Sequence, residues 1–198
     1  MKVDIFRPDE NIYSAFAYFI RGSWNAINDV NALIDTGRDP KIIDFINNLN
    51  TGLGKRKLEL IILTHEHFDH SGMLAKLKEI YKPRAIAFSK NELIDELAYD
   101  GMKIKIGDEI AEILHTPGHS NDSICIYFPE SGALFSGDTI LNIKSPGGTY
   151  TKEYLEVLKR IQKLKISVIY SGHDEPITKN IDKILENSIK NVKESNIF

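Results

Sequence analysis

Short apolar runs, each closed by glycine, proline or polar turn residues, recur along the chain. Runs of this kind are typical of β-strands, and the segments at 101–106 and 110–114 predict a hairpin around the Gly107-Asp108 turn. The expected strands cover residues 3–6, 15–21, 32–35, 58–63, 84–88, 101–106, 110–114, 123–128, 133–135 and 168–170.

Between these runs, apolar residues recur at helical spacing. Helices are predicted after Pro40, after the histidine-rich run that follows residue 63, after Ser89, after Thr151, and over residues 181–197. Their apolar faces consist of Ile42, Ile43, Phe45, Ile46 and Leu49; Leu74, Leu77 and Ile80; Leu93, Ile94 and Leu97; Tyr154, Leu155, Leu158 and Ile161; and Ile181, Ile184, Leu185, Ile189 and Val192. Strands that pair locally and later alternate with helices favour an α/β protein with two sheets face to face and helices on both outer faces.

Composition narrows the class of protein. The chain has 198 residues, of which 42% are hydrophobic and 27% charged, with a formal net charge of −3. These values suit one globular domain over residues 1–198, in which residues 181–198 form a short C-terminal helix and no separate substrate domain is expected. The mildly acidic balance argues against nucleic acid or an anionic membrane as a partner.

Location and assembly follow from the same features. No signal peptide is visible, and the apolar segment 12–20 is far shorter than the roughly 20 residues that span a bilayer. The single cysteine, Cys125, lies in an apolar run and is expected in the core rather than in a disulfide. We therefore expect a cytoplasmic protein, and the sequence leaves the choice between monomer and homodimer open.

The run from Thr64 to His70 carries the most chemical information. Three imidazoles and two carboxylates, those of His65, Glu66, His67, Asp69 and His70, follow directly on an apolar strand. Neutral imidazole and carboxylate are the ligands that borderline divalent metals prefer. His65 and His67 are two residues apart, so on extended backbone they point the same way, whereas Asp69 and His70 lie on the following turn.

Further candidate ligands stand at three other strand ends. His119 follows a Pro-Gly turn, Asp138 follows the strand at 133–135, and His173 follows the strand at 168–170. Together with the first run they make five histidines and two aspartates, which is enough for two cations with an open position, and Asp138 could bridge them.

This pattern resembles the metallo-β-lactamase superfamily, whose signature is His-x-His-x-Asp-His followed by His, Asp and His. The resemblance implies a four-layer αββα sandwich, with His65, His67 and His119 on one metal and Asp69, His70 and His173 on the other. Asp138 and a hydroxide would then bridge the two ions. Zinc is the favoured ion, and iron or manganese are alternatives. A glutamate replaces the equivalent of His67 in the diiron flavoprotein members, so the chain departs from that branch.

Other polar residues receive supporting roles. Asp35 is expected to hydrogen-bond a loop or a ligand histidine rather than a metal. His115 fills no position of the family pattern and is expected to be structural or to support a ligand. Lys144 and Tyr150 are candidates for the substrate pocket.

The best specific match is to glyoxalase II-like hydrolases. The Thr-His-x-His-x-Asp-His opening, the His-Thr-Pro-Gly-His turn and the Ser-Gly-Asp-Thr turn resemble that group, which implies cleavage of a thioester, ester or lactone by a metal-bridging hydroxide that Asp69 orients. Segment 140–150 does not match the glycine-rich basic segment of glutathione-specific members, and only 25 residues follow His173. The alternatives are a small ribonuclease of the same fold, a mononuclear iron persulfide dioxygenase, and a metal-binding regulatory protein without turnover.

Overall fold

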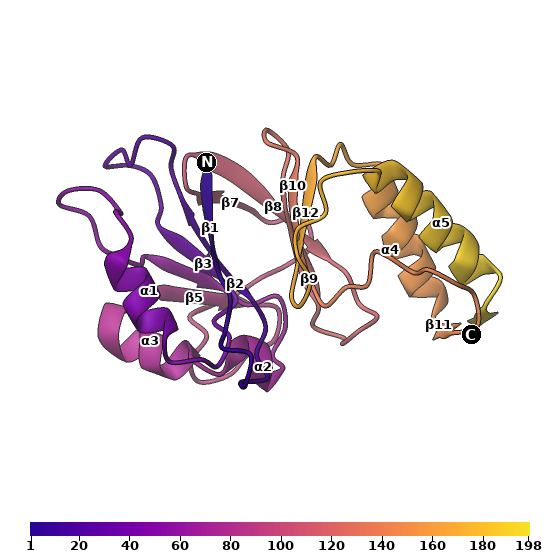
Figure 1. The fold of residues 1–198 in the computed structure, drawn as a ribbon, viewed down its shortest axis with the longest axis horizontal. Coiled ribbons are helices and arrows are strands. Elements are labelled where there is room, and N and C mark those ends of the chain that lie inside the picture. The colour runs from indigo at the N-terminus through magenta and orange to yellow at the C-terminus, as the bar shows by residue number, and fades with distance from the viewer.

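The computed structural model describes residues 1–198 and contains two facing β-sheets with helices on both outer sides (Figure 1). The first half of the chain builds one sheet with the strand order β1-β2-β3-β4-β5-β6, and the second half builds a sheet ordered β12-β10-β9-β8-β7. The first sheet comprises β1 (Lys2–Phe6), β2 (Ala17–Arg21), β3 (Ala32–Ile34), β4 (Leu60–Ile62), β5 (Arg84–Ala87) and β6 (Glu96–Leu97). The second comprises β7 (Lys103–Ile106), β8 (Glu109–His115), β9 (Ile124–Phe128), β10 (Ala133–Gly137) and β12 (Val168–Ser171).

The helices cover the two outer faces. Helices α1 (Ile42–Asn48) and α3 (Leu74–Tyr81) pack on the first sheet, and α4 (Lys152–Gln162) and α5 (Ile181–Lys193) pack on the second. Thr151 caps α4 as expected, because its Oγ1 accepts a hydrogen bond from Tyr154 N at 3.0 Å. The predicted α/β sandwich is confirmed.

Three hydrophobic clusters fill the spaces between the four layers. Strand β9 shows why its sequence is apolar throughout: Ile124 and Ile126 face the cluster between the sheets, while Cys125 and Tyr127 face the cluster under α4 and α5. A strand buried on both faces needs an unbroken apolar run rather than an alternating one. Cys125 is fully buried, as its sequence context indicated.

The prediction of a helix after Ser89 is wrong. That segment contains a short turn and then β6, which adds in parallel to the edge of β5. Asp95 fixes this pairing, since its carboxylate accepts a hydrogen bond from Ala85 N at 2.7 Å and one from Lys78 Nζ at 2.6 Å. These hydrogen bonds stabilise the strand at the edge of the sheet. The helical spacing of three apolar residues is not enough to form a helix there.

The terminal helix also ends earlier than the predicted residue 197. Helix α5 stops at Lys193, and β13 (Asn196–Ile197) pairs in parallel with β11 (Thr149–Tyr150). Ser195 Oγ accepts a hydrogen bond from Gly147 N at 3.0 Å, which draws the chain end onto this segment. The last residues therefore hold the loop that follows β10.

Parallel pairing decides where the candidate ligands lie. Strands β3, β4 and β5 run parallel, as do β10 and β12, so their carboxyl ends reach a common edge of each sheet. The one-turn helix α2 (Phe68–Ser71) begins at this edge, at the bottom of Figure 1. Loops at such an edge are held by rigid strands, which is a frequent location for binding sites.

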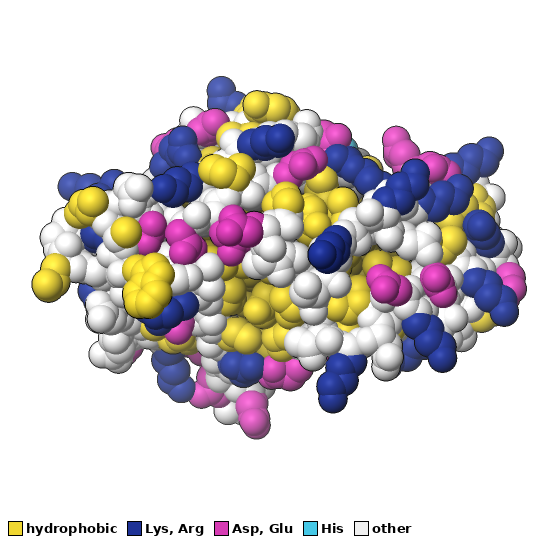
Figure 2. All heavy atoms as spheres, turned by 90° about the horizontal axis from the view of Figure 1, so that it is seen from above, with side chains coloured by type: hydrophobic (Ala, Val, Ile, Leu, Met, Phe, Trp, Pro, Cys, Tyr) yellow, Lys and Arg dark blue, Asp and Glu magenta, His cyan; other side chains and the backbone are white.

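The face of the molecule opposite this edge carries charges of both signs. In Figure 2, Lys and Arg side chains are interspersed with Asp and Glu, and hydrophobic side chains show between them at the centre. A basic stripe of the kind that follows a nucleic-acid backbone is not visible on this face. None of the helices combines the length and apolar character needed to cross a bilayer.

Candidate metal centre

Three histidines form the first cluster. His65 and His67 leave the end of β4 together, and the loop after β8 brings His119 against them. His67 Nδ1 and His119 Nε2 are 2.9 Å apart, and the ring of His65 lies 4.5 Å from that of His67 and 4.8 Å from that of His119, centroid to centroid. One nitrogen from each ring thus converges on a common point.

The second cluster contains Asp69, His70, Asp138 and His173. His173 Nε2 lies 3.2 Å from Asp69 Oδ2, and His70 Nε2 lies 3.8 Å from the same oxygen. These residues come from α2 and from the loops that follow β10 and β12. This one cluster is therefore built from segments that lie about a hundred residues apart in the sequence.

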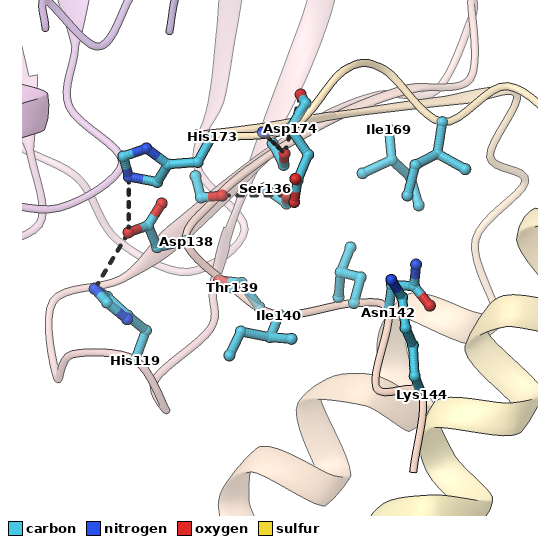
Figure 3. A pocket seen from close by; sticks show the side chains of 15 residues that line it. His119, Ser136, Asp138, Thr139, Ile140, Asn142, Lys144, Ile169, His173 and Asp174 are labelled. Carbon is cyan, nitrogen blue, oxygen red and sulfur yellow. Dashed lines mark hydrogen bonds and ion pairs between the residues drawn. The ribbon is translucent and has the colours of Figure 1, made fainter. Parts of the chain in front are cut away.

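Asp138 belongs to the second cluster and also faces the first. Its Oδ1 is 3.1 Å from His70 Nε2, while its Oδ2 is 3.5 Å from both His119 Nε2 and His173 Nε2 (Figure 3). A single carboxylate thus reaches an imidazole of the first cluster and two of the second. The structure brings together all seven residues that the sequence singled out.

Two buried imidazole nitrogens test whether this set suits a cation. His65 Nε2 is buried without a hydrogen-bond partner, and His70 Nε2 is buried against the carboxylates of Asp69 and Asp138. An unsatisfied buried polar atom destabilises a fold unless a water or an ion serves as its partner. Burial and the neighbouring His70 lower the pKa of His65 to about 4, so its ring is neutral and able to coordinate. The donor set therefore fits borderline divalent metals.

The ring of His70 favours the protonated, charged form, in contrast to the ring of His65. Burial lowers its pKa, but the carboxylates of Asp35 and Asp138 outweigh burial and raise the pKa to about 10. Hydrogen bonds from His173 and His70 likewise overcome burial and hold the pKa of Asp138 far below its ordinary value. A cation entering between these groups would displace the proton of His70, so metal uptake would release protons.

Asp35 orients His70, a candidate ligand, by contacting the ring nitrogen that faces away from the cluster, as expected. Its Oδ2 contacts His70 Nδ1 at 2.8 Å, and its two oxygens accept hydrogen bonds from Thr64 N at 2.7 Å and Thr64 Oγ1 at 2.8 Å. The bond to Nδ1 directs the opposite nitrogen, Nε2, toward the cluster. Asp35 has a φ of +55°, a left-handed conformation that Asp and Asn tolerate better than most residues.

Two glycines allow the strand ends to approach this closely. Gly137 has a φ of +49°, and a Cβ there would collide with Thr64 Oγ1. A Cβ at Gly172 would collide with Asp138 Oδ1 and stand 2.7 Å from His70 Cε1. Only glycine fits at these positions, which explains why each precedes a candidate ligand.

The three other residues that the sequence singled out, His115, Lys144 and Tyr150, lie in different places. His115 lies outside both clusters, with its ring stacked on Phe88 at 3.9 Å between centroids and its Nε2 2.8 Å from Asn121 O. Lys144 lines a cavity of about 580 Å³ that opens beside Asp138, His119 and His173. Tyr150 does not line this cavity, because β11 pairs with β13 and the Tyr150 ring stacks on Tyr154.

Sequence reasoning missed two aromatic residues beside the centre. Tyr13 is 66% exposed and stacks on His173, with 5.7 Å between ring centroids, and Phe68 is 59% exposed and lies 6.1 Å from Tyr13. Phe68 stands inside the histidine-rich run, which was a usable signal. No sequence pattern connects Tyr13 to a residue 160 positions away.

Replacing Tyr13 with alanine should weaken metal binding by the second cluster. The stacked ring holds the half-exposed His173, and such contacts contribute about 0.5–1.5 kcal/mol, or about 2- to 10-fold in affinity. Competition with a chromophoric chelator measures this directly. Tyr13→Phe retains the ring and should bind metal like the unaltered protein, and equal affinity for all three proteins would contradict the orienting role.

Comparison with known proteins agrees with this geometry. The family model for the metallo-beta-lactamase superfamily matches residues 12–173. The chain is 30% identical over 167 residues to a beta-lactamase-like protein 2 homolog of Caenorhabditis elegans, covering 78% of this chain and 55% of the relative. It is also 30% identical over 134 residues to an atrochrysone carboxyl ACP thioesterase of Aspergillus fumigatus, covering 66% and 42%.

A third relative is a hydroxyacylglutathione hydrolase of Francisella philomiragia, which is 40% identical over 89 residues, or 43% of this chain and 35% of the relative. The chain thus spans about a third to a half of the length of these relatives. A solved metallo-beta-lactamase family protein from Thermus thermophilus shares the fold, with a TM-score of 0.71 at 20% identity over 95% of this chain and 78% of that one. The family match covers most of the chain and includes all seven clustered residues, so the protein belongs to the metallo-beta-lactamase superfamily.

Proposed function

We propose that this protein is a binuclear metal-dependent hydrolase that cleaves thioesters, in the manner of glyoxalase II. The position of Asp138 carries the proposal, because its two oxygens face histidines of both clusters at 3.1–3.5 Å. Two of the similar proteins named above are, by name, a thioesterase and a hydroxyacylglutathione hydrolase, which supports a thioester over other acyl substrates.

His65, His67 and His119 would hold one ion, and Asp69, His70 and His173 the other, with Asp138 shared. Zinc suits this set of imidazoles and carboxylates. Two such ions supply a water of lowered pKa and polarise the substrate carbonyl. The remaining roles belong to side chains of the protein.

Asp69 would orient the attacking water. Its carboxylate is buried, and its Oδ2 faces His173 Nε2 at 3.2 Å within the cluster that also contains Asp138. A carboxylate accepts hydrogen bonds and can hold a water in line with a carbonyl carbon. The water would lose one proton to solvent, its oxygen would form the new C–O bond of a carboxylic acid, and the C–S bond would break with its electron pair leaving on sulfur as a thiolate that needs no general acid.

The serines of the cavity support attack by water rather than by a side chain. Ser136 Oγ donates to Gly137 O at 3.4 Å, and Ser171 Oγ donates to Asp174 O at 3.3 Å. Neither hydroxyl is hydrogen-bonded to an imidazole that could act as a base, which a serine nucleophile requires. Cys125 is fully buried, and burial raises the pKa of its thiol to about 11, so it is inert.

Metal content is the first test. Protein purified without added metal should contain two zinc ions per chain by elemental analysis. Prolonged chelation should remove them, lower the melting temperature and abolish turnover, because the clustered ligands then lose their common partner. Metal content well below one ion per chain, in folded protein, would contradict the proposal.

A parallel substrate screen at fixed metal content is the second test. The panel contains S-lactoylglutathione, short acyl-thioesters, homoserine lactones, single-stranded RNA, and glutathione persulfide with oxygen monitoring. Thioester turnover should fall by about 100-fold or more in Asp69→Ala protein that still holds metal. Asp174→Ala removes a carboxylate from the same cavity without touching either cluster and should remain active.

The other outcomes reassign the chemistry. RNA cleavage without thioester turnover would move the protein to the ribonuclease branch, and oxygen uptake by iron-loaded protein would move it to the dioxygenase branch. Equal turnover by the Asp69→Ala and wild-type proteins would remove Asp69 from the mechanism while leaving the metal centre intact.

A further inference from the structure

The first cluster differs from the second in how its side chains are held. His67 and His119 are exposed, so packing fixes their rings only in part, whereas Asp69 and His70 of the second cluster are buried. His67 and His119 are 52 residues apart in the sequence, and their ring nitrogens face one another at 2.9 Å. Exposed rings keep such a position without an ion only if the backbones that carry them are held together.

Hydrogen bonds join the two segments that carry these rings. Where one segment leaves β4 and the other enters β9, Ile124 N donates to Thr64 O at 2.8 Å. A second bond joins them further along, where Glu66 N donates to Asp122 Oδ2 at 2.9 Å. The first bond joins backbone to backbone, whereas the second depends on one side chain, that of Asp122. A single substitution can therefore release the second link and leave the first in place.

This second link lies beside candidate ligands at both of its ends. Glu66 is the residue between His65 and His67, so a bond to its amide fixes the backbone that carries both rings. Asp122 follows His119 by three residues in the loop between β8 and β9. The bond between amide and carboxylate therefore sets the separation of two ligands of the first cluster from the third.

The loop that carries His119 transmits this restraint because it is closed on itself. Ser123 O accepts a hydrogen bond from Thr116 N at 2.8 Å. Ser123 Oγ accepts one from Ser120 N at 3.2 Å and lies 2.7 Å from Ser120 Oγ. Ser120 is next to His119 in the sequence and Ser123 is next to Asp122, so these bonds fix the ligand relative to the carboxylate.

Glu66 is anchored on its other sides by the first half of the chain. Its carboxylate accepts a hydrogen bond from Asn91 Nδ2, and its backbone oxygen accepts one from Ser71 Oγ at 3.1 Å. Neither contact reaches the loop that carries His119. The bond to Asp122 is therefore the one that carries the position of Glu66 across to that loop.

We infer that Asp122 is a positioning residue for the first metal site, where it holds His119 within coordinating reach of His65 and His67. The inference rests on the metal centre of the proposed function and not on its substrate. Loss of a partner that supports metal ligands typically lowers metal affinity by about 10- to 100-fold. Because Asp122 restrains segments of the first cluster, its loss affects the first site and spares the second.

Zinc titration against a competing chelator, followed by NMR of the histidine rings, tests this role without turnover. Signals from the three histidines of the first cluster report one site, and those of His70 and His173 report the other. In Asp122→Ala protein the first site should bind zinc about 10-fold more weakly than in wild-type protein, and the second should change by less than about 2-fold. Asp122→Asn keeps an acceptor oxygen and the shape of the side chain, so it should restore first-site affinity.

Asp100→Ala is the matched control. Asp100 Oδ1 accepts a hydrogen bond from His115 N at 2.8 Å, so it also holds the backbone beside this loop, but at the end of β8 rather than at Glu66. An equal loss of first-site affinity in this control would overturn the inference, because any loosening of the loop would then suffice. Wild-type affinity of Asp122→Ala protein, an equal loss at both sites, or failure of Asp122→Asn to restore binding would also overturn it.

Amide hydrogen exchange examines the link in the metal-free protein. The Glu66 amide should exchange slowly in wild-type protein, because Asp122 accepts its hydrogen, and about 10-fold faster or more in Asp122→Ala protein. Fast exchange of this amide in wild-type protein would overturn the inference even if the variant failed to fold. Absence of any zinc-induced change at the histidines of either cluster in wild-type protein would instead overturn the proposed function.

Discussion

Replacing Asp35 with alanine is expected to lower the free energy of unfolding by about 3–5 kcal/mol, together with metal affinity. Three donors, Thr64 N, Thr64 Oγ1 and His70 Nδ1, would lose their shared buried acceptor. Because the total stability of a domain is only about 5–15 kcal/mol, the melting temperature should fall by about 10 °C. Chemical denaturation of metal-free protein measures this loss separately from the effect of metal.

Two further substitutions at the same position separate the causes. The φ of +55° would strain alanine, whereas glycine adopts it freely, so Asp35→Gly retains the loss of the acceptor but removes the strain. Asp35→Asn keeps the shape and one acceptor oxygen and should be intermediate. If Asp35→Gly were as stable as the wild-type protein, the cause would be backbone strain rather than the lost hydrogen bonds.

The metal affinity of these variants follows the orientation of His70. Without the bond at Nδ1, His70 is free to rotate or to present the other nitrogen, and the loss of such a partner typically lowers metal affinity by about 10- to 100-fold. Asp39→Ala is a suitable control, since Asp39 is a buried aspartate of the same loop whose carboxylate accepts hydrogen bonds from Asp9 N and Lys41 N. Its loss should destabilise the fold and leave metal affinity unchanged.

The clustered residues could be predicted from the sequence because each part of the pattern has a local cause. Strand ends are visible as the points where apolar runs stop, and the glycines beside Asp138 and His173 mark close approach of backbone. The role of Asp35 could also be inferred, since a carboxylate at a strand end before a tight turn is suited to hydrogen-bond a loop or a ligand histidine. Patterns within one segment thus predicted the parts that meet at the centre.

Features that depend on contacts between distant segments could not be predicted. The 89–97 segment is a strand rather than a helix because Lys78 and the β5 backbone hold Asp95. Tyr150 is held against Tyr154 by strand pairing with the chain end, and Tyr13 joins the centre by packing on His173. In each case the deciding partner lies too far along the chain to appear in a local pattern.

The seven clustered residues predict a second large effect, at Asp138. Asp138→Asn should reduce bound metal and lower thioester turnover by at least about 100-fold. The change keeps the shape of the side chain but replaces one oxygen with an amide group that cannot coordinate, and it removes the charge that faces His70, His119 and His173. Elemental analysis and kinetics at saturating zinc measure the two effects.

The pattern of metal loss decides whether Asp138 is shared. Because its Oδ1 faces His70 and its Oδ2 faces both His119 and His173, the substitution should weaken both ions at once. Asp174→Asn makes the same chemical change in the same cavity, outside either cluster, and should keep its metal and its activity. Loss of only one ion would show that Asp138 serves a single site, and the two clusters would then act as separate metal sites that do not share a ligand.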